Sequence, residues 1–135
     1  MIEARVMTIW GDSGPYLTRV TLGRLRLHVF HRGDEDPDCH DHPADFWTFP
    51  LVTYVEEFID RGGVRQWRLV RAFRLHPRRA EFAHRVIGPA GGTGHGATIV
   101  WWGRERRPWG FHTAEGWVGW RPYIEGKARE VGGDA

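Results

Sequence analysis

The sequence predicts one all-β domain, an antiparallel sandwich or barrel, and three observations support that prediction. The chain has 135 residues, which is the length of a single domain. Apolar stretches of strand length alternate with turns rich in Gly, Pro and Asp. No stretch shows the periodicity of a crossover helix, so neighbouring strands are expected to pair antiparallel.

The first half of the chain contains four apolar segments that predict strands. They cover residues 5–10, 16–22, 24–31 and 46–58. In residues 24–31 apolar and polar side chains alternate, as on a strand with one buried face. Pro50 interrupts the last segment, and because proline cannot donate a ladder hydrogen bond we expect a sheet edge or a bulge there.

The second half predicts further strands separated by a hairpin turn and a glycine-rich loop. The strands cover residues 64–75, 84–87, 97–103 and 109–120, the last as one or two short strands. The turn falls at residues 61–63, and the loop at residues 88–96 contains five glycines. We therefore expect a domain over residues 1–124 and a flexible tail over residues 125–135, with no helix.

The charge balance argues against nucleic-acid and membrane partners. There are 19 basic and 17 acidic residues, and the arginines form no dense patch beyond residues 104–107. No stretch approaches the ~20 apolar residues that span a bilayer, and residues 1–10 lack the pattern of a signal peptide. Cys39 is the single cysteine, so no intramolecular disulfide can form, and a cytoplasmic location is expected.

Tryptophan is unusually frequent, with eight residues in the chain. Large amphipathic rings are common in the walls of ligand pockets as well as in cores. The candidates for pocket walls are Trp47, Trp101, Trp102 and Trp109. This composition favours a small molecule as the partner of the protein.

His40 and His42 form the most informative pair in the sequence. In an extended segment, side chains two residues apart point to the same side, roughly 6.6 Å apart along the strand. Two imidazoles in this arrangement can bind one metal ion, and imidazole suits Zn, Fe, Ni and Cu. The alternative is a polar loop that happens to contain two histidines. A long apolar strand follows the pair, as expected for a site at the mouth of a barrel.

The segment His-Asp-His-Pro-Ala-Asp from His40 to Asp45 resembles the first cupin motif, in which His-x-His precedes an acidic residue. His84 lies on a predicted strand about forty residues downstream, where the second cupin motif places its metal-binding histidine. The resemblance covers residues 25–102. It implies a single-domain double-stranded β-helix, a jelly-roll barrel, that holds one divalent metal ion and forms a homodimer. Fe(II) is the first expectation for the ion, with Zn, Mn, Ni or Cu as alternatives.

The fourth ligand is where the sequence departs from the cupin pattern. In the usual spacing the acidic ligand would fall at Phe46 or Trp47, and neither can bind a metal. Asp45 lies one position early and is our candidate, with Glu56, Glu57 or water as alternatives. The expected ligand set is His40, His42, His84 and Asp45.

Two further residues are candidates for chemistry. Glu56 and Glu57 have opposite parity on one strand, so one of them should point inward, and we take Glu57 as the candidate general base. Arg71 lies on an otherwise apolar strand face, where an inward arginine needs a partner. It could bind a substrate carboxylate or pair with a glutamate. The alternative is that the opposite face of this strand, with Arg68, points inward.

The function that the resemblance implies is a mononuclear metal-dependent enzyme acting on a small organic molecule, with an Fe(II) dioxygenase or other oxygenase first. One alternative is an isomerase, epimerase or lyase in which the ion serves only as a Lewis acid. Another is a non-catalytic cupin that binds a small ligand. The fold alone does not identify the substrate.

Overall fold

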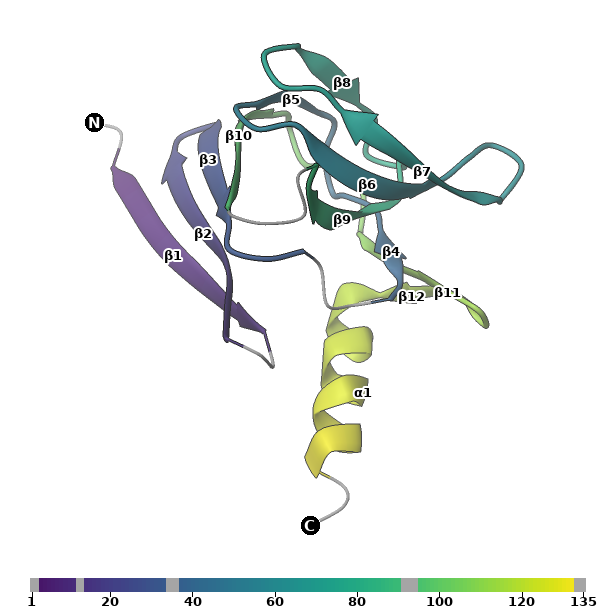
Figure 1. Ribbon diagram of the computed structural model, residues 1–135. Helices are drawn as coiled ribbons and strands as arrows, with labels where there is room; N and C mark the ends of the chain where they lie inside the picture. Colours follow the sequence, from purple (N-terminus) through teal and green to yellow (C-terminus); the bar gives the residue numbers. More distant parts are fainter. Residues whose placement is uncertain (1–2, 12–13, 34–36, 91–94, 133–135) are drawn as a thin grey trace.

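The computed structural model describes residues 3–11, 14–33, 37–90 and 95–132. Nearly all of its regular structure is β, which confirms the all-β prediction. Figure 1 shows the strands in two layers, with a helix extending below them. Part of the glycine-rich loop, residues 91–94, and the last three residues of the expected tail lie outside the described residues.

The first sheet has six antiparallel strands in the order β1-β2-β3-β10-β5-β8. Their bounds are β1 Ala4–Gly11, β2 Gly14–Leu22, β3 Leu25–Phe30, β10 Gly96–Trp102, β5 Phe46–Pro50 and β8 His76–Arg78. Strand β10 pairs with β3 on one side and β5 on the other. This sheet therefore brings together three parts of the chain that are distant in sequence.

The second sheet also has six antiparallel strands, in the order β12-β11-β4-β9-β6-β7. Their bounds are β12 Gly116–Gly119, β11 Gly110–Thr113, β4 Cys39–His40, β9 His84–Pro89, β6 Tyr54–Ile59 and β7 Arg65–Val70. Strand β4 is the short strand in the middle of this sheet. It pairs with β11 on one side and with the start of β9 on the other.

The core lies between the two sheets, because alternate residues of each sheet face the other. Tyr54, Val70 and Val86 of the second sheet form a buried cluster, and Phe30 of the first sheet packs against it. Val100 is buried on the same face of the first sheet as Phe30. Full burial of such a side chain stabilises the fold by about 1.5–3 kcal/mol, so this cluster holds the layers together.

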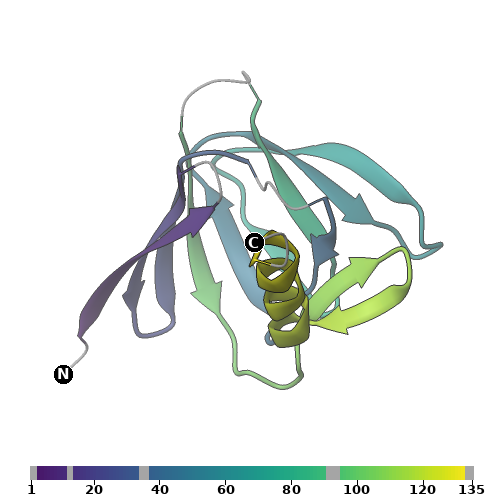
Figure 2. The same cartoon turned by 90° about the horizontal axis from the view of Figure 1, so that it is seen from below.

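The expected closure into a barrel is wrong. Within the described residues, no strand of one sheet is hydrogen-bonded to a strand of the other. Strands β4 and β8 have only two and three residues, too few for the continuous ladder that closure requires. Seen from below in Figure 2, the two layers stand apart at the end that carries β1. The architecture is a two-sheet, cupin-like jelly roll with open edges.

Two of the long predicted strands are shorter in the structure, and the first of them divides into two. The segment 46–58 turns after Pro50, so that β5 lies in the first sheet and β6 in the second. The segment 64–75 ends as a strand at Val70, and Phe73 in the following turn has a φ of 60°. A bulky residue rarely adopts this conformation, so the composition of the segment did not reveal the turn.

The expectation that the chain has no helix is also wrong, because α1 spans Trp120–Gly132. The segment contains Pro122, Gly126 and Gly132, and proline and glycine are the weakest helix formers, so its composition does not predict a helix. Its first turns are held by aromatic stacking, with ring centroids 3.9 Å apart for Tyr123 and Phe111 and 5.9 Å apart for Trp120 and Trp109. The division of the chain at residue 124 stays a prediction, although that residue lies inside α1.

Asp41 ties the end of the second sheet to the segment that carries the two histidines of the His-x-His pair. Its side chain is almost completely buried. Its carboxylate accepts hydrogen bonds from the backbone N–H of Gly110 at 2.7 Å and from Trp117 Nε1 at 2.9 Å. It also lies 3.0 Å from His112 Nε2 and 3.2 Å from a nitrogen of Arg107. One carboxylate thus anchors both strands of the β11–β12 hairpin.

We expect Asp41→Asn to lower the free energy of unfolding by about 3 kcal/mol, because an amide nitrogen would face donors that are left unpaired. Urea denaturation monitored by tryptophan fluorescence measures this change. The matched control is Glu115→Gln in the exposed turn of the same hairpin, which should change the free energy by less than about 0.5 kcal/mol. Equal effects of the two substitutions would contradict the anchoring role of Asp41.

Within the described part of the chain, no helix is both long and apolar enough to cross a membrane.

Candidate metal centre

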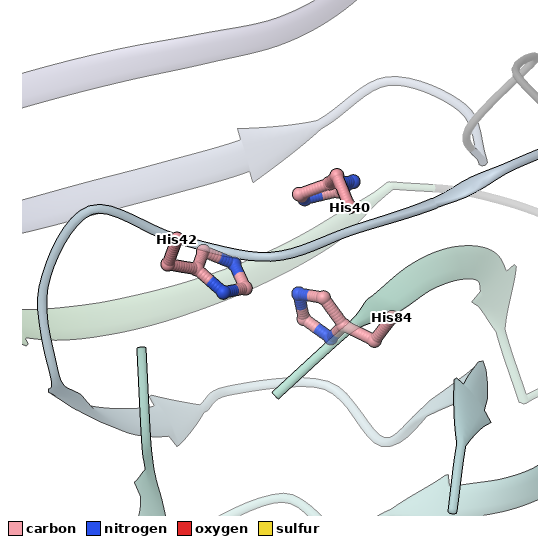
Figure 3. A group of neighbouring side chains, drawn as sticks. All are labelled: His40, His42 and His84. Carbon is pink, nitrogen blue, oxygen red and sulfur yellow. The ribbon is translucent and has the colours of Figure 1, made fainter. Parts of the chain in front are cut away.

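Three histidines from two parts of the chain meet between the sheets. His40 belongs to β4, His42 follows it by two residues, and His84 begins β9 directly opposite His40. One ring nitrogen of each histidine lies within 4.8 Å of one nitrogen of the other two. Figure 3 shows the three rings turned toward one another. The structure therefore brings together the three histidines that the sequence analysis selected.

Two of these rings are fixed from behind by hydrogen bonds. His84 Nδ1 lies 2.7 Å from Glu56 Oε1, and His42 Nδ1 lies 3.2 Å from the carbonyl oxygen of Phe82. A carboxylate and a carbonyl oxygen accept hydrogen bonds, so in both rings Nδ1 carries the proton. The Nε2 lone pairs are then available as ligands, which is the usual arrangement behind a metal-bound histidine.

Glu56 is the buried carboxylate of the site, with no exposed surface. Besides His84, it accepts hydrogen bonds from Arg68 Nε at 2.7 Å and Arg78 Nη2 at 2.9 Å. Burial by itself would raise the pKa of Glu56, but the hydrogen bond and charge of His84 and the two arginines lower it to about 2. Glu56 is therefore a carboxylate at physiological pH and a permanent acceptor for His84.

His42 is held in its neutral form. Burial lowers the pKa of His42 well below its usual value, and the charges of His84 and His40 lower it further. Only a neutral imidazole can offer a lone pair to a metal ion. The environment of His42 thus favours the protonation state that a ligand requires.

Aromatic side chains surround the three histidines. The centroid of His42 lies 4.7 Å from that of Phe46 and 6.3 Å from that of Trp102. His40 lies 6.2 Å from Trp109 by the same measure. Trp102 and Trp109 are thus pocket-wall candidates that the structure places beside the histidines. These rings make the immediate surroundings of the histidines largely aromatic.

Trp47 and Trp101 lie elsewhere. Both are about half exposed, on the outer face of the first sheet. They line a shallow surface hollow of about 480 Å³ together with Arg79 and Pro77. Strand β10 therefore directs Trp102 inward and Trp101 outward, and only the strand register shows which of the two faces the core.

Asp45 does not join the three histidines. Its side chain is half exposed and pairs with Arg106 at 2.8 Å, while also accepting a hydrogen bond from the backbone N–H of Ala80 at 2.7 Å. These partners, Arg106 first, lower the pKa of Asp45. The residue after it, Phe46, points inward, so the parity of the strand directs Asp45 to the surface.

Glu57 likewise points away from the histidines. Its carboxylate lies on the outer face of the second sheet, bonded to Arg65 at 2.9 Å and Trp67 Nε1 at 2.6 Å. The inward glutamate is Glu56. Tyr54 lies two residues before Glu56, so the two side chains share one face of β6, and Tyr54 is a core residue. The burial expected for a tyrosine could therefore have identified Glu56 as the inward glutamate.

Arg71 is an exposed residue of the turn after β7, so the structure does not place it against the histidines. The buried arginine is Arg78, directly opposite Phe46 across the β5–β8 pair. It approaches Glu56, as described above, and its Cζ atom lies 4.7 Å from the ring centroid of Phe82. Arg78 was not predicted from the sequence, because only the strand register places it inside.

The loop between β10 and β11 fixes the backbone that follows His42. The N–H of Gly103 donates to the carbonyl of Asp45 at 2.8 Å, and Arg107 Nη1 donates to the carbonyl of His42 at 2.9 Å. A Cβ atom at Gly103 would lie 2.5 Å from the carbonyl oxygen of Asp45, so only glycine allows this approach.

The sequence matches no family model and no curated protein. Its fold is nevertheless similar to several solved structures. The structure of Fe(II)-HppE with the alternative substrate (S)-1-HPP has a TM-score of 0.58 and 16% identity, over 73% of this chain and 55% of that one. Hydroxypropylphosphonic acid epoxidase from S. wedmorenis has a TM-score of 0.54 and 15% identity, over 73% of this chain and 54% of that one. This chain thus spans little more than half the length of these proteins.

Two further similar structures come from different classes of protein. The capsular polysaccharide assembling protein CapF from Staphylococcus aureus has a TM-score of 0.54 and 13% identity, over 77% of this chain and 32% of that one. Drosophila melanogaster CENP-C bound to CAL1 has a TM-score of 0.53 and 6% identity, over 73% of this chain and 81% of that one. At these identities the similarity is one of fold: this chain is a cupin-like two-sheet protein with a group of three histidines that could hold a metal ion.

Proposed function

We propose that this protein is a mononuclear metal-dependent enzyme that acts on a small organic molecule, with His40, His42 and His84 as the metal ligands. The observation that supports it is the convergence of three ring nitrogens within 4.8 Å, behind which Glu56 and a backbone carbonyl fix two rings. A carboxylate behind a metal-binding histidine orients the ring and raises its basicity.

The donor set fits a divalent transition metal with open coordination positions. Three imidazoles suit Fe, Zn, Ni or Cu. Structural zinc sites have four protein ligands, and Cys39 is the nearby side chain that could supply one. Its Sγ atom instead lies 3.7 Å from the carbonyl oxygen of Glu57, away from the three histidines. A three-ligand site leaves room for a substrate, which favours catalysis over a structural role.

The finer proposal is an Fe(II) oxygenase. It draws on the resemblance of the histidine motif and on the fold shared with an Fe(II) enzyme. When bound, the ion would supply a Lewis acid and, if it is Fe(II), electrons for oxygen chemistry. The chain's own contribution is to hold three imidazoles close together, with His42 kept neutral, to orient His84 through Glu56 and to line the centre with aromatic side chains. The homodimer and the cytoplasmic location stay predictions.

Metal analysis of protein purified anaerobically tests the centre directly. We expect roughly one transition-metal ion per chain in the wild type and less than about one tenth of that in His42→Ala. The control is His76→Ala, a histidine on β8 whose Nε2 lies 3.0 Å from the carbonyl of Arg71 and outside the group. Unchanged metal content in His42→Ala, or no metal in the wild type, would refute the centre.

A second measurement separates the oxygenase from Lewis-acid alternatives. Nitric oxide binds Fe(II) where oxygen would, so the Fe(II)-loaded protein should give the electron paramagnetic resonance signal of an iron–nitrosyl complex. Absence of that signal in protein that contains Fe(II) would argue against an open position. Sites of this kind generally bind Zn more tightly than Fe(II), so relative affinity does not separate the two functions. Bound Zn and no Fe in protein purified anaerobically from iron-supplemented cells would favour the isomerase, epimerase or lyase alternative.

We expect Glu56→Gln to weaken metal binding about 10- to 100-fold, because the amide is a poorer acceptor for His84 and leaves Arg78 without its carboxylate. Competition with a chelator measures the affinity, and circular dichroism checks that the variant folds. Glu57→Gln is the matched control, because the carboxylate of Glu57 is next in sequence but faces the opposite side of the sheet. Equal losses in both variants would show that the effect is not specific to His84.

A further inference from the structure

Besides Arg78, which pairs with Glu56, the inner face of the first sheet carries two further arginines, Arg19 and Arg26. Arg19 lies opposite His28 across the β2–β3 pair, and Arg26 lies opposite Val100 across the β3–β10 pair. Phe30, two residues beyond His28 on the same strand, packs against the core cluster of the second sheet. The alternation of β3 therefore directs His28 and Arg26 toward the space between the sheets.

These cations have no acidic partner in the described residues. Arg19 Nε donates to His28 Nε2 at 3.2 Å, and neither Arg19 nor Arg26 forms an ion pair there. Burial lowers the pKa of both arginines, and for Arg19 the charge of Arg26 lowers it further; Glu105 acts on Arg26 in the opposite direction. Burial first, and then both arginines, lower the pKa of His28 to about 3.

Arg26 and Trp102 each have a buried N–H group without an acceptor. The Cζ atom of Arg26 lies 4.6 Å from the ring centroid of Trp102. Arg26 Nε and Trp102 Nε1 have no hydrogen-bond partner within the described part of the chain, and the same holds for Nε of Arg78, whose Nη2 is bonded to Glu56. A buried donor without an acceptor loses its hydrogen bonds to water without replacement, so native structures seldom leave one unused. Because the arginine side chain is long and partly exposed, its guanidinium can turn to meet an acceptor that enters.

The unused donors lie next to the histidines. Trp102 stacks on Phe46 with ring centroids 5.3 Å apart, and both rings contact His42. The one buried carboxylate beside His84, Glu56, is already paired with Arg68 and Arg78. Neutral imidazole ligands would not offset the charge of a divalent ion either. The region between the sheets therefore has an excess of positive charge.

We propose that Arg26 and Trp102, supported by the charge of Arg19, bind the anionic group of the substrate, a carboxylate or a phosphate-type group. The assignment rests on the proposed function in one respect, namely that the rest of the substrate reaches the three histidines. An anion satisfies both unused donors and offsets the unpaired guanidinium, which a neutral ligand does not. The acid-binding role that the sequence suggested for Arg71 thus falls to residues of β3 and β10.

The test follows the indole Nε1–H resonance of Trp102 by two-dimensional NMR during titration with acetate and, separately, with inorganic phosphate, at constant ionic strength in a chloride buffer. Trp102→Phe identifies the resonance by its disappearance. We expect a saturable shift with at least one of the two anions, and the stronger of the two identifies a carboxylate or a phosphate-type group. Acetamide, which is similar in size to acetate but neutral, should bind at least about tenfold more weakly.

The matched variants are Arg26→Gln and Arg24→Gln, which remove the same charge two residues apart. Arg24 is exposed in the turn before β3. Arg26→Gln should weaken the saturable shift at least about tenfold, whereas Arg24→Gln should leave it unchanged. No saturable shift with either anion, equal binding of acetamide, or full binding by Arg26→Gln would overturn the proposal and leave Arg26 with only a packing role against Trp102.

The titration is made on metal-free and on metal-loaded protein, and the metal content of each sample is measured. If the protein binds no metal but the anion binds through Arg26, the proposed metal centre fails while the anion site stands. If metal binds and the anion does not, the anion site fails alone. The two ideas are thus separated within one set of samples.

Discussion

The buried carboxylate of Glu56 is the interaction on which the rest of the site depends. From β6 it receives hydrogen bonds from Arg68 on β7, Arg78 on β8 and His84 on β9. Strand β8 belongs to the first sheet and the other strands to the second, so this one group joins the two layers beside the candidate metal centre. An ionised carboxylate without exposed surface is stable only with such partners, which makes the arrangement of the four strands and the orientation of His84 interdependent.

A second buried carboxylate, that of Asp41, holds the β11–β12 hairpin against the segment that carries His40 and His42. In an extended segment alternate residues face opposite sides, so the parity that directs His40 and His42 to the centre directs Asp41 away from it. There it anchors β11 and β12 through Gly110 and Trp117. The short strand β4 has only two residues and could not hold its place by ladder hydrogen bonds alone. Side-chain bonds to Asp41 supply the missing constraint.

The space between the sheets carries more positive than negative charge among the described residues. Glu56 is paired with Arg68 and Arg78, burial favours the neutral form of His42, and Arg19 and Arg26 form no ion pair among the described residues. An interior with uncompensated positive charge is costly to a protein that binds nothing there. The structural neighbours share only the fold, and among them are proteins as different as an epoxidase and CENP-C. The case for a function therefore comes from the site residues and not from the fold.

The amino-acid sequence by itself determined the β class, most of the strand positions and the three histidines, because alternation, turn residues and the His-x-His spacing are local properties. It did not determine the open edges, the helix at the C-terminal end or the residues around the histidines. Asp45 was predicted from the cupin resemblance and Glu57 and Arg71 from strand faces, yet all three point away from the histidines, while Glu56, Arg78 and Arg26 face the space between the sheets. Which of two neighbouring residues points inward depends on strand register across the sheet, and a shift of one residue reverses every side chain. Only the tertiary structure decides that register, since it is set by contacts between segments far apart in the chain.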